Sequence, residues 1–187
     1  MRIITGIYKG KFIVMPKGIR PTQNVVRKAV FDILGDIEGL SFLELFAGSG
    51  AVGLEAKSRG VSELVFVESN RECILALNKN IEALKVKDCS LYPRQAEEAI
   101  KDLYKQQRKF DLVFLDPPYY QDLTKKTLQT LGACDILSPN GLIVVQHFKK
   151  DPLPDTLGDL NLLRQSKYGA TLLSILGKIS RNSSQES

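Results

Sequence analysis

The sequence contains no tryptophan, one histidine and only three cysteines among its 187 residues. The cysteines, Cys73, Cys89 and Cys134, are widely spaced and form no CxxC pair, so they predict neither a disulfide framework nor a zinc site. No apolar run approaches the roughly 20 residues of a membrane span, and Lys9 and Lys11 interrupt the stretch where a signal peptide would have its core. We therefore expect a cytoplasmic protein without a membrane span or a bound metal.

Acidic residues are absent from the first part of the chain, where no Asp or Glu precedes Asp32. Seven basic residues lie between Met1 and Lys28, so the remaining 159 residues carry a net charge of −2 out of the total of +5. A local cationic surface attracts polyanions such as nucleic acid by neutralising phosphates. On charge alone, a solvated basic face explains the cluster equally well.

The amino-terminal residues 1–35 predict a basic appendage. The stretch "RIITGIYKGKFIV" has two β-branched runs around a glycine and is typical of a β-hairpin. Thr22 is placed to cap a helix from about Gln23 to Leu34, whose apolar face includes Val26 and Val30. Length and composition fit a single domain over residues 1–179, followed by a flexible polar tail over residues 180–187.

From Ser41 onward, strand-like runs alternate with segments of helical periodicity, which predicts βαβ units. The expected strands are residues 42–46, 64–67, 90–92, 110–115 and 142–145. Two later runs, "DLNLLRQSKYG" and "ATLLSILGKIS", predict an antiparallel pair at the sheet edge. The expected fold is α/β and Rossmann-like, with a mostly parallel central sheet and helices on both faces.

A glycine-rich segment, "LELFAGSGAVGLEA", joins the first of these strands to a helix. Its Gly48, Gly50 and Gly53 satisfy GxGxxG, a pattern that binds nucleotides but also occurs in tight turns without a ligand. Glu68 ends the next strand, where open α/β sheets place an acid that binds ribose hydroxyls. Glu44 points into the same crevice, where it would repel a dinucleotide's pyrophosphate and attract the ammonium of S-adenosylmethionine (SAM). Charge therefore favours SAM over NAD.

The strand "FDLVFL" ends in Asp116-Pro117-Pro118-Tyr119. Two prolines fix the chain and remove backbone donors, so this turn displays a carboxylate, carbonyl groups and an aromatic ring. Such a turn is suited to a flat polar ligand. His147 follows a buried strand with no acid or nucleophile beside it in sequence, and we interpret it as structural.

Together, "ELFAGSG", "VES" and "DPPY" resemble class I SAM-dependent methyltransferases that act on exocyclic amino groups. The opening "MRIITGIYKGKFIVMPKGIRPT", with "LELFAGSGAVGLEAKSRG", "FDLVFLDPPY", "GLIVVQH" and "KYGATLLS", is similar to the RsmD family of small-subunit (16S) ribosomal RNA guanine-N2 methyltransferases. This resemblance extends from Met1 to about Ile179. It implies a SAM cofactor and small-subunit ribosomal RNA as partner, either naked or in an assembling 30S particle.

The resemblance also implies roles for individual residues. SAM would be held by Glu44, Ala47, Gly48, Gly50, Glu68, Gln95 and Asp116. Asp116 and Pro117 would accept hydrogen bonds from the target amine, and Tyr119 would stack on the extruded base. RNA would be contacted by Lys9, Lys11, Arg20, Thr22 and Arg27.

The chain departs from the family pattern at several of these positions. Glu44 and Gln95 stand where relatives usually have aspartate, although the Gln95 amide oxygen can still accept a hydrogen bond from an adenine amino group. Gln146 replaces a usual glutamate, and the sequence suggests no mechanism for it. Asp116 either orients the amine or also takes its proton, and the sequence does not separate the two.

Three other functions are compatible with parts of the pattern. Adenine-N6 methylation of DNA shares "DPPY", although no target-recognition domain is evident. A dinucleotide-dependent oxidoreductase shares GxGxxG but would need a second substrate domain. A non-catalytic RNA-binding module would use the basic hairpin and leave the Asp-Pro-Pro-Tyr turn unexplained.

Overall fold

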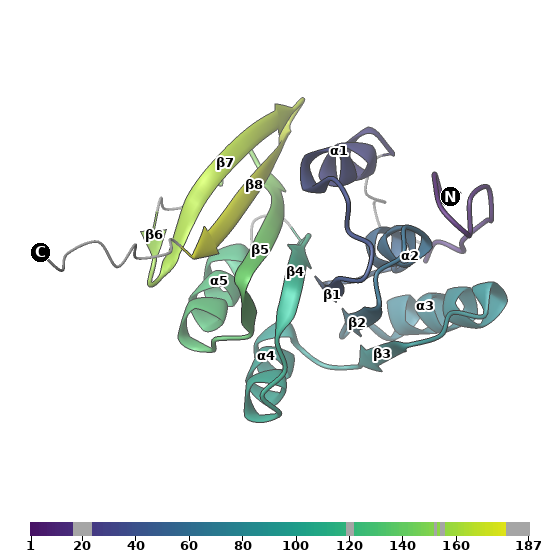
Figure 1. Cartoon of the computed structure of the whole chain (residues 1–187), viewed down its shortest axis with the longest axis horizontal. Helices are drawn as coiled ribbons and strands as arrows, with labels where there is room; N and C mark the ends of the chain where they lie inside the picture. Colours follow the sequence, from purple (N-terminus) through teal and green to yellow (C-terminus); the bar gives the residue numbers. More distant parts are fainter. Residues whose placement is uncertain (17–23, 119–121, 152, 154–155, 179–187) are drawn as a thin grey trace, which may run out of the picture.

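The computed structural model describes residues 1–16, 24–118, 122–151, 153 and 156–178. Within these ranges the centre of the molecule is an eight-stranded sheet in the order β3-β2-β1-β4-β5-β8-β7-β6 (Figure 1). The parallel part consists of β1 (Ser41–Leu45), β2 (Glu63–Val67), β3 (Cys89–Tyr92), β4 (Phe110–Leu115) and β5 (Leu137–Phe148). The antiparallel part consists of β6 (Thr156–Leu157), β7 (Leu160–Tyr168) and β8 (Thr171–Lys178). The predicted parallel sheet with an antiparallel edge is confirmed.

Helices cover both faces of this sheet, as predicted. One face carries α1 (Asn24–Leu34), α2 (Ala51–Ser58) and α3 (Arg71–Leu84), and the other carries α4 (Ala96–Lys105) and α5 (Leu123–Ala133) (Figure 1). Successive strand residues point to opposite faces, so Phe42 packs in the first core and Leu43 in the second. Each fully buried Phe or Leu side chain contributes roughly 1.5–3 kcal/mol relative to exposure, so both layers stabilise the sheet.

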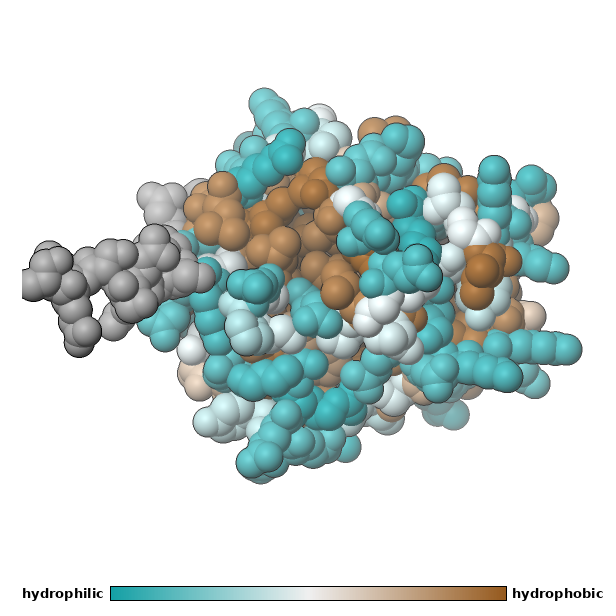
Figure 2. All heavy atoms as spheres, in the orientation of Figure 1, coloured by the Kyte–Doolittle hydropathy of each residue, from teal (hydrophilic) through white to brown (hydrophobic). Residues whose placement is uncertain are grey.

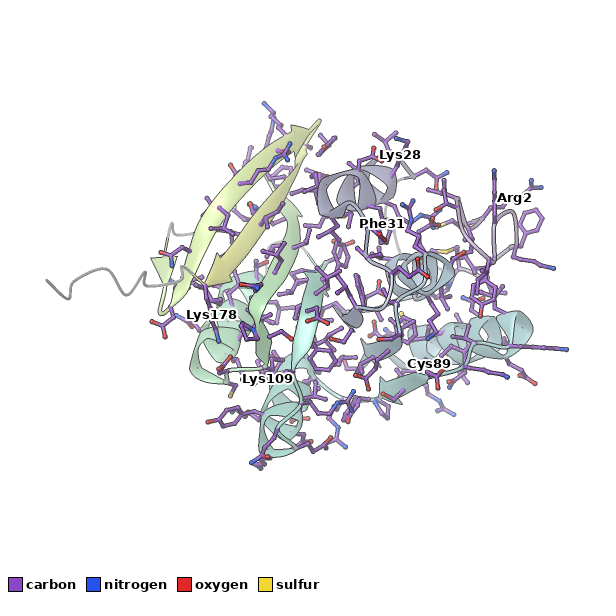
Figure 3. The ribbon with its side chains drawn as sticks, in the orientation of Figure 1. Arg2, Lys28, Phe31, Cys89, Lys109 and Lys178 are labelled. Carbon is purple, nitrogen blue, oxygen red and sulfur yellow. The ribbon has the colours of Figure 1, made fainter. Side chains whose placement is uncertain are left out.

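Helix α1 matches the predicted helix except that its described part begins at Asn24. Its buried face contains Val26, Val30 and Phe31. Phe31 points from α1 toward α2, where the guanidinium of Arg59 lies 4.3 Å from the centre of its ring (Figure 3). The predicted Thr22 cap lies outside the described residues.

Strand β5 is much longer than the predicted 142–145. It begins at Leu137, which pairs with Phe110, and the register then shifts so that Leu112 pairs with Leu142. This bulge absorbs Pro139 and its neighbours, which are typical of a turn in sequence but lie within the strand.

The amino-terminal hairpin is present but contains only one isolated antiparallel bridge, between Arg2 and Phe12. Further backbone hydrogen bonds link its two arms, as from Ile3 N to Lys11 O (3.0 Å), and α2 holds it to the rest of the protein. The buried carboxylate of Glu55 accepts hydrogen bonds from Ile4 N (2.7 Å), Thr5 N (3.0 Å) and Thr5 Oγ1 (2.8 Å). The hairpin is therefore fastened to the helix that follows the glycine loop.

The chain order creates a topological switch point between β1 and β4. From β1 the chain moves outward to β2 and β3, and it then returns to the other side of β1 to form β4. In open α/β sheets, ligands bind outside the carboxyl ends of the strands at such a point.

Candidate cofactor and substrate site

Four side chains from neighbouring strands lie at the carboxyl edge of the parallel sheet, three just after their strands and one within β5. Leu45 of β1 pairs with Val67 of β2 and Leu115 of β4, and Leu115 pairs with Val145 of β5. The residues one position further along are Phe46, Glu68, Asp116 and Gln146. The register therefore brings Glu68 and Asp116 to the same edge, on either side of the switch point.

The glycine loop leaves β1 through a tight turn. Phe46, Gly48 and Gly50 all have positive φ angles, of 59°, 56° and 74°. The amides are used inside the protein, because Ala47 N donates to Val67 O (3.0 Å) and Gly50 N donates to Ala47 O (2.7 Å). The loop is thus a fixed element rather than a row of free donors.

The three glycines of GxGxxG have different physical roles. A Cβ at Gly50 would lie 2.3 Å from a methyl carbon of Leu77, and a Cβ at Gly53 would lie 2.7 Å from Glu44 Oε2. Gly50 is therefore glycine because α3 packs closely on the loop, and Gly53 because α2 packs closely on the sheet. A Cβ at Gly48 would meet nothing within 4 Å. Of the three glycines, Gly48 is therefore the one with room for a ligand beside it.

Glu68 connects the glycine loop to the end of β2. Its Oε2 accepts from Gly48 N (2.7 Å), and its Oε1 accepts from Ser69 N and Asn70 N, both at 2.8 Å. A carboxylate has about four acceptor sites, and three are used here. The remaining capacity is compatible with the predicted contact to a ribose hydroxyl.

Glu44 is buried, with 3% of its surface exposed, and Oε2 accepts from Gly53 N at 2.8 Å. Burial raises the pKa of Glu44 to about 8; the amides of Gly53 and Val52 act to lower this pKa, and the carboxylates of Asp116 and Glu68 act to raise it. Three carboxylates that repel one another are stabilised by a cation placed among them.

This arrangement decides between the two cofactor classes that the glycine pattern allows. A dinucleotide needs donors for its pyrophosphate, but Ala47, Gly48 and Gly50 direct their amides to protein acceptors. The charges gathered around the loop are carboxylates, which suit the ammonium and sulfonium of SAM. Glu44, Glu68 and the open side of Gly48 are the groups that would hold it.

The described part of the Asp-Pro-Pro-Tyr turn consists of a half-buried Asp116, a buried Pro117 and an exposed Pro118. Tyr119 lies outside the described residues. Gln95 precedes α4 beyond the end of β3, and its exposed side chain makes no capping hydrogen bond. The roles expected for these residues stay predictions.

The residues expected to contact RNA have different environments. Lys9 and Lys11 are exposed on the hairpin, whereas Arg20 and Thr22 lie outside the described residues. Arg27 has no exposed surface, and its guanidinium donates to Arg2 O (2.5 Å) and Asn24 Oδ1 (3.1 Å). The expectation that Arg27 faces RNA is therefore wrong, because a fully buried guanidinium does not reach a phosphate.

Asn80 of α3 is a residue of the site region that the sequence did not reveal. Its Oδ1 accepts from Val14 N (2.7 Å), and its Nδ2 donates to Val14 O (3.0 Å) and to Ser49 O in the glycine loop (2.9 Å). This one amide joins the end of the hairpin to the cofactor loop. A polar residue on the inner face of an otherwise amphipathic helix was the available signal.

His147 has the structural role that the sequence suggested. Nε2 lies 2.8 Å from Ser174 Oγ, and Nδ1 lies 2.9 Å from Asp151 O. Burial lowers the pKa of His147, so the neutral ring is favoured. Burial also raises the pKa of Cys73 to about 11, which does not suit a nucleophile.

The described residues contain neither a candidate membrane span nor a candidate metal site. No helix among them is both long enough and apolar enough to cross a membrane. No group of three or more His, Cys, Asp or Glu side chains in the same ranges is arranged to hold a metal ion.

Comparison with known proteins connects this geometry to one family. The family described as "Conserved hypothetical protein 95" matches residues 1–177. The chain belongs to this family. It is 36% identical over 162 residues to Ribosomal RNA small subunit methyltransferase D of Haemophilus influenzae, covering 82% of this chain and 81% of the relative. It is 31% identical over 172 residues to the protein of the same name from Escherichia coli K12, covering 90% and 85%. The resemblance to the RsmD family is thereby confirmed.

Solved structures of similar proteins share the fold. A hypothetical protein of Thermus thermophilus superposes with a TM-score of 0.82 at 32% identity, covering 94% of this chain and 98% of that one. A ribosomal protein L11 methylase from Lactobacillus delbrueckii has a TM-score of 0.69 at 13% identity, covering 93% and 89%. The second likeness shows the fold alone, which is that of Rossmann-like methyltransferases.

Proposed function

We propose that this protein transfers a methyl group from SAM to the exocyclic N2 amine of a guanosine in small-subunit ribosomal RNA. The observation that carries the proposal is the meeting of Glu44, Glu68 and Asp116 at the switch point of a Rossmann-like sheet. Membership of a family whose relatives are named small-subunit ribosomal RNA methyltransferases supports the activity and the class of substrate. A cytoplasmic location agrees with that substrate.

The residues of the Asp-Pro-Pro-Tyr turn would prepare the amine. SAM, when bound, supplies a methyl group that its sulfonium already activates. A guanine amine is a poor nucleophile because its lone pair is delocalised into the ring. Hydrogen bonds from this amine to the Asp116 carboxylate and to the Pro117 carbonyl would fix the nitrogen and favour a more tetrahedral geometry. Alignment of this kind lowers the activation free energy of a reaction by roughly 7–11 kcal/mol in favourable cases.

The hairpin offers a surface suited to single-stranded RNA at a distance from the reacting base. Phe12 is 67% exposed, and the guanidinium of Arg2 lies 4.2 Å from its ring centroid (Figure 3). Lys9 and Lys11 are exposed on the same segment. Aromatic and basic groups in combination bind unpaired bases and phosphates. The turn of the hairpin contacts Ser58, the last residue of α2, whereas the glycine loop precedes the first. An eight-residue helix is about 12 Å long, so these groups would contact nucleotides away from the target.

A methyl-transfer assay tests the proposal. The protein is incubated with SAM labelled in its methyl group and with small-subunit ribosomal RNA or assembly intermediates from cells that lack the gene, and the nucleosides are then separated. We expect labelled N2-methylguanosine, and its absence would contradict the proposal. Labelled N6-methyladenosine would instead identify an adenine methyltransferase. Duplex DNA in a parallel reaction controls for the choice of nucleic acid.

A further inference from the structure

Gln146 has a buried polar atom that the fold does not satisfy. The side chain lies on β5 and is only 6% exposed, and its Oε1 has no hydrogen-bond partner among the described residues. An unsatisfied buried acceptor costs about as much as a lost hydrogen bond, so such groups are rare and call for a ligand or another explanation. The neighbouring polar residues His147 and Ser174 are, by contrast, hydrogen-bonded to each other.

The position of Gln146 relates this atom to the proposed reaction. Leu115 and Val145 form the last pair between β4 and β5, and Asp116 and Gln146 are the residues that follow them. Adjacent strands lie about 4.8 Å apart, so the register places the two residues side by side. Val144, two positions earlier on β5, packs in the same core as Phe114 of β4. By alternation, Gln146 and Asp116 lie on this face as well.

The surroundings suit a flat, partly apolar ligand. Figure 2 shows hydrophobic residues gathered between α1 and the β7–β8 pair, the region toward which the arrowhead of β4 points in Figure 1. Gln146 pairs with Leu173 of β8, which is fully buried in the core that α1 covers. A base whose ring rests on apolar side chains would bring its polar edge to Asp116 and Gln146.

We infer that Gln146 is a specificity-determining residue that accepts a hydrogen bond from N1–H of the target guanine. The inference rests on the proposed function. In guanine, the ring nitrogen next to the exocyclic amine on the Watson–Crick edge is a donor, N1–H. In adenine, the ring nitrogen next to the exocyclic amine is also N1, but it carries no hydrogen and is an acceptor. The Gln146 Oε1 acceptor therefore matches N1–H of guanine, whereas N1 of adenine would need the amide to turn and present Nε2 instead.

Three variants separate this role from packing. Gln146→Met keeps the size of the side chain and removes the amide, whereas Gln146→Glu keeps an acceptor oxygen and removes the donor. Gln129→Met, on the exposed face of α5, makes the same exchange away from the site. Methyl transfer is measured on small-subunit ribosomal RNA or particles from cells lacking the gene. SAM affinity and thermal unfolding are measured for each purified variant.

We expect Gln146→Met to lower kcat/KM for RNA by about ten- to a hundred-fold, with SAM affinity unchanged. The kcat/KM of Gln146→Glu should stay within a few-fold of the wild-type value. The kcat/KM of Gln129→Met should equal the wild-type value. Equal activity of Gln146→Met and wild type would overturn the inference. So would loss of activity in both Gln146 variants with SAM affinity and folding retained, because that pattern would assign recognition to the amide nitrogen. Production of N2-methylguanosine by the wild type tests the proposed function separately.

Discussion

Two buried glutamates on the same side of the sheet have opposite environments. Glu55 of α2 has no exposed surface, and it accepts from Ile4 N, Thr5 N and Thr5 Oγ1 and pairs with Arg59 at 3.2 Å. Glu44 of β1 accepts from Gly53 N, but its charged neighbours include Asp116 and Glu68, and burial raises its pKa to about 8. The fold therefore satisfies the carboxylate that fastens the hairpin, whereas the group in the crevice favours its protonated form until a cation binds beside it.

Structural and functional polar groups of this chain differ in how completely the protein itself satisfies them. Glu55 and Asn80 form hydrogen bonds with backbone groups of the protein itself. Gln146 is similarly buried with an unsatisfied Oε1, and Glu44 is buried near two other carboxylates with its pKa raised. Perturbed and unsatisfied groups gather at functional sites, and both of these lie at the carboxyl ends of strands beside the switch point.

The largest loss of activity is expected on replacing Asp116, which lies in the crevice with Glu44. Asp116→Ala should lower kcat for methyl transfer by roughly 10²–10³-fold, because the amine loses the acceptor that orients it. RNA binding should be largely retained, since the cationic hairpin is unchanged. The measurements are single-turnover methyl transfer and RNA binding at fixed salt. Asp159→Ala, an exposed position before β7, is the matched control.

Asp116→Asn sharpens this prediction, because asparagine keeps an acceptor oxygen but cannot take a proton at neutral pH. If Asp116→Asn is much more active than Asp116→Ala, Asp116 only orients the amine. If both variants lose activity equally, Asp116 also accepts the proton. Equal loss of RNA binding and activity in Asp116→Ala would show that the turn has been misassigned.

On the structural side, Glu55→Ala should destabilise the protein by about 3 kcal/mol or more, because it leaves buried backbone donors of the hairpin without acceptors. Urea unfolding measures the free energy of unfolding. Hydrogen exchange at Ile4 and Thr5 reports whether the hairpin detaches from α2. Glu82→Ala, exposed on α3, is the control, and equal stability of the two variants would refute the role given to Glu55.

Glu44→Gln should weaken SAM binding by about ten- to a hundred-fold, since the carboxylate that faces the cofactor's ammonium loses its charge. The amide oxygen can still accept from Gly53 N, so the fold should persist. Calorimetry in two buffers of different ionisation enthalpy should show that wild type releases a proton on binding SAM near neutral pH. The variant should release less, and identical proton release would contradict the prediction.

The raised pKa of Glu44 also predicts how ligand-free stability depends on pH. The folded protein holds the Glu44 proton up to about pH 8, whereas the unfolded chain loses it near the ordinary value of 4.5. Between these values the folded state binds more protons, so the free energy of unfolding falls as pH rises. The loss should be on the order of a few kcal/mol in wild type and should be reduced in Glu44→Gln, as measured by urea unfolding at about pH 5 and about pH 8.

The smallest effect is expected on the hairpin surface. Replacing Lys9 and Lys11 by Ser should weaken RNA binding a few-fold. The slope of log K for RNA binding against log salt concentration should become shallower by about 0.7 for each lost phosphate contact. Stability should not change, since both side chains are exposed. Replacing Lys101 and Lys105, exposed on α4 across the sheet, is the control. Equal effects of the two pairs would indicate nonspecific charge attraction.

The sequence alone predicted those strands whose residue pattern depends only on neighbours along the chain. Alternating apolar runs predicted β4 with the bounds that it has and the antiparallel pair of β7 and β8. Pro139 and its neighbours concealed the start of β5, because a bulge that depends on pairing with β4 is not visible in a single strand. The placement of Glu44 and Glu68 followed from the glycine pattern and the order of the strands.

Residues whose roles depend on distant contacts were misjudged or missed. Arg27 was expected to contact RNA because of the family resemblance, but it is buried against Arg2 O and Met1 Sδ from the start of the chain. Glu55 and Asn80 bond to residues about 50 and 66 positions away. Gln146 stood out in sequence only as a replacement of a usual glutamate, and its unsatisfied oxygen became apparent in the structure.

The most direct test of the central claim is mass mapping of small-subunit ribosomal RNA from cells with and without this gene. We predict that one N2-methylguanosine is lost in the deletion, and that it returns with the wild-type gene but not with Asp116→Ala expressed at the same level. An unchanged methylation map, or loss of a methyl group from another base, would contradict the account.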